Sequence, residues 1–150
     1  MIKKIILIFA FLLATGCGYT PLYSTKNFDF KVKNITSSKN SRLDSKVERG
    51  LRRFSNQKGQ KIISLKMDTK KEINILSKDS KGDPSRYEMI ISIELETLDY
   101  QNRNINRSFK NSFNYNNKKN KFDFKKYENE IEDLLIDKNI DLIVIFLSKI

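Results

Sequence analysis

Two stretches decide the fold of this 150-residue chain: YEMIISIELE at residues 87–96 and INRSFKNSFNY at residues 105–115. In both, apolar and polar side chains alternate with a period of two, which is typical of a strand with one buried face. The apolar positions are Tyr87, Met89, Ile91, Ile93 and Leu95 in the first stretch and Ile105, Phe109, Phe113 and Tyr115 in the second. A short polar connection joins the stretches, so we predict an antiparallel hairpin with one face on the core.

Two polar residues, Arg107 and Asn111, interrupt the apolar face of the second stretch. Long polar side chains at the rim of a core bury their stems and keep their heads in water. We therefore expect this strand to lie at an edge of the sheet, where both heads reach solvent.

A helix is expected before the hairpin, because Leu43, Val47, Leu51 and Phe54 recur at the spacing of one helix face. Its predicted signals are a cap at Asn40 or Ser41, an acid in the first turn at Asp44, and a stop at Gly59. The opposite face is basic, with Arg42, Lys46, Arg49, Arg52 and Arg53.

Strands are expected on either side of this helix. Residues 28–33 and 63–68 each alternate apolar and polar side chains. Residues 72–75 repeat the alternation, either as a separate short strand or as a continuation of 63–68 past an irregular stretch. The sequence Gly82-Asp83-Pro84 is a turn signal before the hairpin.

A long helix is expected at the C-terminal end, where Phe124, Tyr127, Ile131, Leu134 and Leu135 mark one face. Six acidic residues between Glu128 and Asp141 are expected on its outer side. Residues 141–147 are apolar on all sides and would suit a strand as well as a helix. Since only Asn139 breaks the pattern before them, we expect the helix to continue.

This order of elements predicts an α+β fold, a two-layer sandwich. Two helices would pack on one face of a roughly four-stranded sheet, mostly antiparallel or mixed. We expect one such domain over residues 28–150.

The composition excludes several classes of site. The chain has no His and one Cys, so it has no His-based catalytic triad, no His/Cys zinc site and no internal disulfide of its own. Carboxylate pairs such as Glu94 with Glu96, and Glu130 with Asp133, are not gathered into a cleft by the sequence. We therefore expect no enzyme, no metal site and no catalytic residue.

The N-terminus has the three parts of an export signal at residues 1–16. Two lysines follow Met1-Ile2, ten apolar residues run from Ile5 to Ala14, and small residues precede Cys17. The apolar run is shorter than the roughly 20 residues that a membrane-spanning helix needs. The segment Leu12-Leu13-Ala14-Thr15-Gly16-Cys17 resembles the lipobox of bacterial lipoproteins. Ala14 and Gly16 would also suit the ordinary signal peptidase, which would leave a free thiol.

The lipobox resemblance implies a diacylglycerol on the Cys17 thiol and an acyl chain on its new amino group, and no other cofactor. Each buried CH₂ contributes about 0.8 kcal/mol, so several chains anchor a protein firmly. Residues 17–27 would then be a lipidated tether.

The start of the expected mature chain, Cys17-Gly18-Tyr19-Thr20-Pro21-Leu22-Tyr23, resembles LptE, the lipopolysaccharide-assembly lipoprotein family, in its alphaproteobacterial form. The order of elements resembles that family along nearly the whole chain, including an Arg that opens a long strand, here Arg86. The resemblance implies a lipid-anchored protein on the periplasmic face of the outer membrane. It also implies that the protein plugs the LptD-type β-barrel, supports its assembly, binds lipopolysaccharide and catalyses no reaction.

The charge distribution suits such a ligand. The chain carries a formal net charge of +11, and residues 101–126 contain eight basic residues and one acidic residue. Because lysine and arginine make charge-assisted bonds to phosphates, we predict anion contacts at Arg86, Arg103, Arg107 and Lys110. The plainer interpretation of these side chains is a solvated basic surface.

Two other functions compete with this one. The chain could be a different periplasmic lipoprotein that acts as an envelope assembly or adaptor module, or that binds lipids. A nucleic-acid-binding domain would use Phe109, Phe113 and Tyr115 as a stacking platform. We interpret those aromatics as core residues, and an exported protein does not meet chromosomal nucleic acid, so we expect no nucleic-acid partner.

Overall fold

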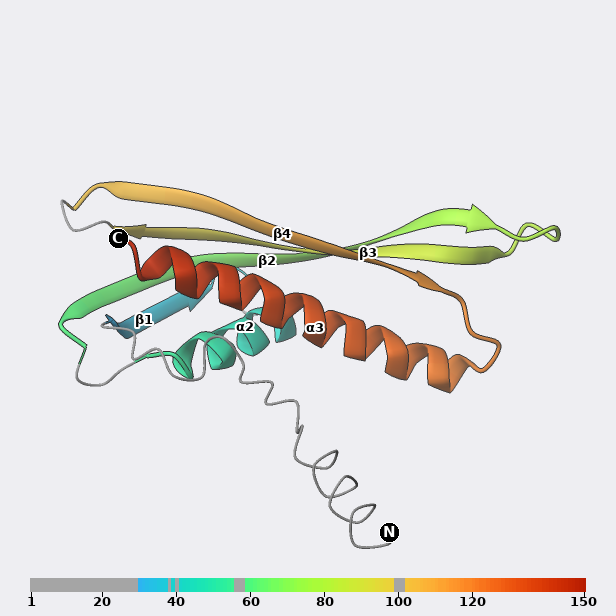
Figure 1. The fold of residues 1–150 in the computed structure, drawn as a ribbon, viewed down its shortest axis with the longest axis horizontal. Helices are drawn as coiled ribbons and strands as arrows, with labels where there is room; N and C mark the ends of the chain where they lie inside the picture. Colours follow the sequence, from blue (N-terminus) through green and yellow to red (C-terminus); the bar gives the residue numbers. More distant parts are fainter. Residues whose placement is uncertain (1–29, 38, 40, 56–58, 99–101) are drawn as a thin grey trace, which may run out of the picture.

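The sheet has four strands in the order β1-β2-β3-β4 (Figure 1). A computed structural model of the protein describes residues 30–37, 39, 41–55, 59–98 and 102–150. The predicted signal, tether and Cys17 lie outside these residues. The elements are β1 Phe30–Ser37, α2 Arg42–Arg52, β2 Lys61–Lys78, β3 Pro84–Leu98, β4 Asn104–Asn116 and α3 Lys121–Leu147.

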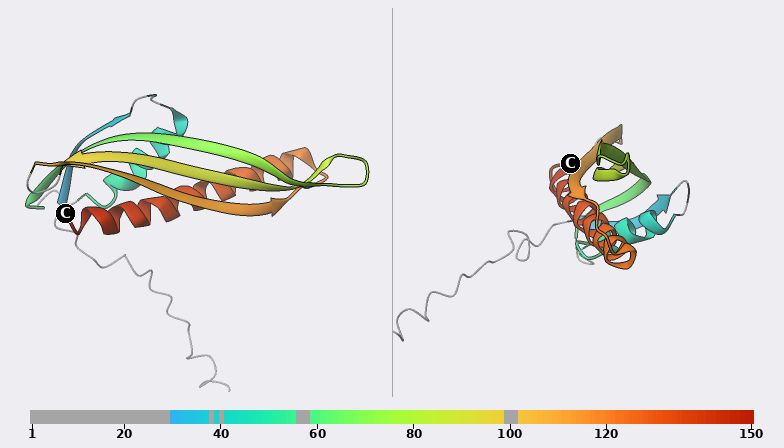
Figure 2. Two further views of the ribbon diagram at one scale, coloured as in Figure 1. Left: turned by 90° about the horizontal axis from the view of Figure 1, so that it is seen from above. Right: turned by 90° about the vertical axis from the view of Figure 1, so that its right-hand side faces the viewer.

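The predicted α+β fold is confirmed. Strand β1 pairs with β2 in parallel, and the β2–β3 and β3–β4 pairs are antiparallel, so the sheet is mixed. The two helices lie on one face of the sheet, which is long and strongly twisted (Figures 1 and 2). The opposite face of the sheet is covered by no described element.

Strand β2 is longer than its sequence pattern indicated, because residues 63–68 and 72–75 belong to one strand. Its pairing with β3 runs regularly through Thr69, Lys70 and Lys71, and the irregularities come only after Ile75. Thr69 and Lys71 pair with core residues of β3, so the alternation continues there with polar side chains on the apolar face. The prediction of an irregular stretch was wrong for that reason.

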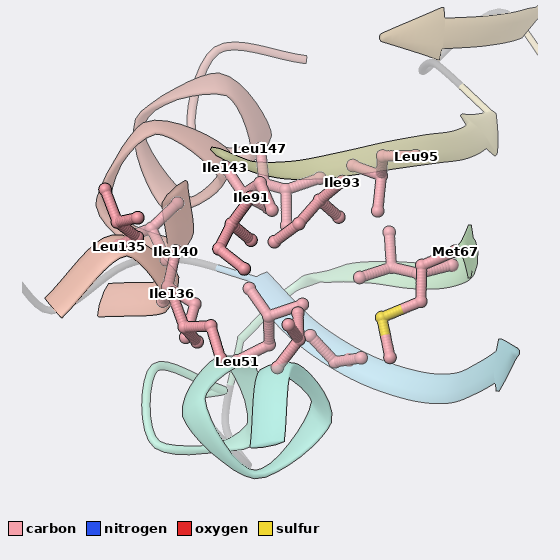
Figure 3. Close-up of a cluster of buried hydrophobic side chains, with 14 of the residues drawn as sticks. Leu51, Met67, Ile91, Ile93, Leu95, Leu135, Ile136, Ile140, Ile143 and Leu147 are labelled. Atoms are coloured by element: carbon pink, nitrogen blue, oxygen red, sulfur yellow. The ribbon is translucent and has the colours of Figure 1, made fainter. Parts of the chain in front are cut away.

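The core lies between this face of the sheet and the helices. Leu51 of α2, Met67 of β2 and a row of β3 side chains meet the α3 residues Leu135, Ile136, Ile140, Ile143 and Leu147 (Figure 3). Each fully buried Ile or Leu contributes about 1.5–3 kcal/mol relative to an exposed one. The aromatics predicted as core, Phe109, Phe113 and Tyr115, belong to this cluster or pack against it.

Helix α2 begins at a capping box. Ser41 accepts a hydrogen bond from the backbone N–H of Asp44, and Asp44 accepts one from the N–H of Ser41. The buried Asp44 carboxylate also accepts from the hydroxyl of Ser37 in β1 and, at 3.0 Å, from the N–H of Thr69 in β2. One carboxylate therefore caps the helix and fixes it to two strands.

Helix α3 extends from Lys121 to Leu147, with Asn120 as its N-cap. The apolar tail is its last part, so the helical prediction is confirmed and the strand alternative is wrong. Lys121 is the first residue of the helix, directly after this cap.

Two glycines mark close approaches of the backbone. Gly59 was predicted to stop α2, but α2 ends earlier, at Arg52. A Cβ at Gly59 would lie 2.6 Å from the carbonyl carbon of Phe30, so this glycine lets the chain pass β1. Gly50 is buried on α2, and a Cβ there would collide with the side chain of buried Ile140 on α3.

We expect Gly50→Val to destabilise the protein by about 1–3 kcal/mol, because it forces extra volume into the α2–α3 contact. Urea unfolding followed by circular dichroism measures this change. The control is Arg49→Val at the exposed neighbouring position, which should shift stability by about 0.5 kcal/mol or less. A Gly50→Val protein as stable as this control would contradict the helix–helix packing.

Candidate functional site

The end of the molecule near the β2–β3 turn carries an aromatic cluster. The rings of Tyr87 and Tyr115, neighbours on β3 and β4, stack with centroids 5.5 Å apart. Phe124 of α3 lies 5.5 Å from Tyr87 and 5.9 Å from Tyr115. Tyr127 meets Tyr115 edge-on at 6.2 Å, and the ammonium of Lys118 lies 4.0 Å above the Tyr127 ring.

Large apolar side chains lie exposed around this cluster. Ile75 pairs with Tyr87 on the same face of the sheet and is 52% exposed, and Ile73 is 43% exposed. Phe122, in the first turn of α3, is 76% exposed. The same end of the molecule carries exposed cations. Arg86 lies next to Tyr87 on β3, with its side chain on the opposite face of the sheet, and the others surround the start of α3: Lys118, Lys119, Lys121, Lys125 and Lys126. We call the exposed apolar residues and these cations the distal surface.

The structure does not bring the four predicted anion contacts together. Arg86 pairs with Asn116 and belongs to the distal surface. Lys110 pairs with Ser92, six residues further along β3, which places it about 20 Å away. Arg103 precedes β4, so Arg107 and Arg103 lie still further from Arg86, towards the β3–β4 turn.

Arg107 and Asn111 behave differently from each other. Arg107 is exposed on edge strand β4, and its guanidinium lies 5.9 Å above the ring of Phe146, as the edge prediction required. Asn111 instead donates to the amide oxygen of buried Asn139 at 2.8 Å, and Asn139 donates to the carbonyl of Ile91. The prediction that both heads reach water was therefore wrong for Asn111.

A buried carboxylate, Glu132 of α3, lies where the two helices meet the sheet. It accepts hydrogen bonds from Lys46 of α2 at 2.6 Å and from Lys71 of β2 at 2.8 Å. Arg42 of α2 approaches it to 3.6 Å. Burial raises the pKa of Glu132, but the hydrogen bonds from Lys46 and Lys71 outweigh burial and hold that pKa below its usual value.

This cluster corrects the prediction that the acidic residues of the last helix face outward. Glu132 is buried, and so is Glu128, which accepts a hydrogen bond from the hydroxyl of Tyr115 at 2.9 Å. Burial, followed by that hydrogen bond, raises the pKa of the Tyr115 hydroxyl well above its usual value. The sequence does contain a sign of this ion pair. Lys71 falls on the apolar face of its strand, and Glu132 falls next to the apolar positions of its helix.

Other carboxylates form ordinary surface pairs. Glu96 accepts from Lys66 at 3.0 Å, and Asp133 accepts from Lys46 at 2.6 Å. Lys66, Glu94, Glu96, Asn106 and Ser108 help to line an open hollow of about 530 Å³ on the uncovered face of the sheet. In the described part of the chain, no three acidic or other metal-binding side chains are gathered for a metal ion.

Neither α2 nor α3 is both long and apolar enough to span a bilayer.

Solved bacterial lipoproteins share this fold. The crystal structure of rare lipoprotein B from Shewanella oneidensis superimposes with a TM-score of 0.63 at 14% sequence identity, covering 79% of this chain and 94% of that one. The solution structure of an uncharacterized lipoprotein B from Nitrosomonas europaea gives 0.59 at 15% identity, covering 81% and 86%. A minor lipoprotein from Acinetobacter baumannii gives 0.56 at 13% identity, covering 81% and 92%. At these identities the likeness shows a common fold.

The sequence itself gives no such match. No protein-family model and no curated protein matches it.

The Glu132 cluster makes stability depend on pH. A carboxylate whose pKa is lowered by folding stabilises the protein above its unfolded pKa, near 4.5, and this contribution is lost as the pH falls through the lower folded value. We expect Glu132→Gln to cost about 1.5–3 kcal/mol at pH 7 and clearly less at pH 3, measured by urea unfolding.

The matched control is Glu130→Gln on the exposed side of the same helix, which should change stability little at either pH. A loss for Glu132→Gln that is the same at pH 7 and pH 3 would show that the charge of Glu132 is not what stabilises the junction.

Proposed function

We propose that this protein is an outer-membrane lipoprotein of the lipopolysaccharide assembly machinery, anchored through Cys17 on the periplasmic face. It plugs an LptD-type β-barrel, supports the assembly of that barrel and binds lipopolysaccharide. It is not an enzyme and needs no cofactor beyond its covalent lipid. The lipobox at Cys17, the motif that follows it and the fold shared with solved lipoproteins support this proposal.

The distal surface carries the proposal for the ligand. Lipid A presents phosphates beside acyl chains, so a protein surface that receives it needs cations beside exposed apolar side chains. The distal surface combines both, because Phe122 and Ile75 are exposed at the same end of the molecule as Arg86 and the lysines near the start of α3. Scattered exposed apolar residues are ordinary, but several in one basic region favour a binding surface.

Of the four cations that the sequence proposes, the geometry favours Arg86. Arg86 is exposed and pairs with Asn116, directly before the lysine-rich connection to α3. Arg103, Arg107 and Lys110 stay candidates for anion contacts, but they lie away from that connection along β4. We therefore place the lipid phosphates at the distal surface.

A pull-down from solubilised outer membranes tests the partner. The tagged full-length chain should capture an LptD-type β-barrel as its largest partner, whereas another tagged outer-membrane lipoprotein should not. Replacement of the lipid-bearing thiol by Cys17→Ser should release the protein from the membrane fraction. Capture of no barrel, or of the same proteins by the control, would favour an envelope adaptor with a different partner.

Charge reversal tests the ligand. The variant Arg86→Glu/Lys118→Glu/Lys121→Glu should weaken binding of purified lipopolysaccharide to the detergent-solubilised full-length protein by at least about tenfold, which is 1.4 kcal/mol. The variant Arg103→Glu/Arg107→Glu/Lys110→Glu makes the same change of charge between the middle of β4 and the β3–β4 turn, and should weaken binding less.

The two variants separate the possible sites, with circular dichroism as the check that both fold. A larger loss in the second variant would place the site along β4 near the β3–β4 turn instead of at the distal surface. Unchanged binding in both would overturn the proposal that these cations bind lipopolysaccharide.

A further inference from the structure

The two edges of the sheet are unequal. Strand β1 is a short edge of eight residues, and its pairing with β2 shifts between Val32 and Asn34. Strand β4 has thirteen residues and pairs with β3 from end to end without a shift. Bulges, prolines, short length and charged side chains are the usual means of protecting an edge from a further strand. Strand β4 has no bulge and no proline and is not short, and its protection consists of two cations, Arg107 and Lys110.

The free side of β4 keeps its backbone groups unpaired. The strand has a neighbour on one side only, and no described group outside the sheet hydrogen-bonds to its backbone. An exposed edge of this kind can accept a further strand through main-chain hydrogen bonds.

Helix α3 provides an apolar shelf next to this edge. Asn139 and Phe146 of α3 touch Asn111 and Phe109 of β4. Leu142 lies between Asn139 and Phe146 on the same side of the helix, by the three- and four-residue spacing, and is 45% exposed. The C-terminal half of α3 is visible beyond β4 when the sheet is seen from above (Figure 2, left). An added strand would place its inward side chains over Leu142 and Phe146.

The charges of the edge decide between possible occupants. The charged residues of β4 are Arg107 on the core side and Lys110 on the outer side, both basic. A second copy of the chain would bring like charges together along the paired edges, which is destabilising. An incoming strand with acidic side chains on its outer face beside Lys110, and one acidic side chain on its inner face beside Arg107, would instead pair with both residues.

We propose that β4 is a docking edge for an extended segment of another protein. That segment adds to the sheet as a fifth strand, with apolar side chains toward Leu142 and Phe146 and acidic side chains beside Arg107 and Lys110. This surface is separate from the distal surface, and the proposal does not depend on lipopolysaccharide binding.

The probe is a synthetic peptide that alternates valine and glutamate, with the one inward valine opposite Arg107 also replaced by glutamate. It is added to the ¹⁵N-labelled full-length protein in detergent micelles, and amide exchange and chemical shifts are recorded by NMR. We expect slower exchange and shifted resonances along β4. A peptide with lysine in place of glutamate, and one with a central proline, should bind at least tenfold more weakly.

Variants of the protein separate strand pairing at β4 from general attraction to a basic protein. Arg107→Glu/Lys110→Glu should weaken the glutamate peptide at least tenfold, whereas Lys118→Glu/Lys119→Glu, with the same change of charge, should not. Because the lysine and proline peptides need no variant, the test stands even if a variant fails to fold.

Three results would overturn the proposal. The first is a glutamate peptide that leaves the β4 amides unchanged. The second is equal binding of the proline peptide, since attraction by charge alone would explain it. The third is a concentration-dependent dimer of the protein joined through β4 in the absence of peptide.

Discussion

The sheet has one apolar face, and a single helix covers most of its length. Helix α3 has 27 residues and spans about 40 Å, whereas the 18 residues of β2 span about 60 Å. The helix cannot cover a face that is longer than itself, so apolar side chains stay exposed where the β2–β3 hairpin extends past the core. Ile73 and Ile75 lie there. The surface that we assign to the lipid ligand is thus a direct consequence of the mismatch in length.

The ion cluster at Glu132 sets how α2, β2 and α3 pack against one another. A buried ion pair often contributes little net stability, because desolvation of its charges opposes their attraction. Its geometry is nevertheless demanding, since Lys46 comes from α2, Lys71 from β2 and the carboxylate from α3. Only one relative placement of the three elements satisfies all these groups. Asp44 acts similarly in the same N-terminal part of α2, where it joins the helix cap to β1 and β2.

Much of this architecture could be predicted from the sequence, and the errors have a common cause. Alternation and helical spacing identified the β3–β4 hairpin and both helices, because those patterns follow from apolar burial within one element. The polar core residues were misjudged, because their burial depends on partners far away in the chain. Lys71 looked irregular without Glu132 opposite it, and Asn111 looked solvent-exposed without Asn139. Likewise, Gly59 is needed because the backbone of Phe30 passes close to it, and the sequence around Gly59 does not reveal that contact.

The candidate site was predictable only in part, because residue type does not fix position along a long sheet. The four cations chosen from the sequence are close in the chain or on adjacent strands, yet strand geometry separates Arg86 from the other three. The exposure of Phe122 is equally invisible in the sequence, where it reads as one more apolar residue at the start of a helix.

The position of α3 in the chain has a consequence for how the protein is made. A polypeptide is synthesised from its N-terminus, and all four strands precede the helix that covers them. The apolar face of the sheet is therefore complete before its cover exists. Until α3 has been synthesised, the nascent chain exposes this apolar face to solvent. A chain truncated before α3 would expose it permanently.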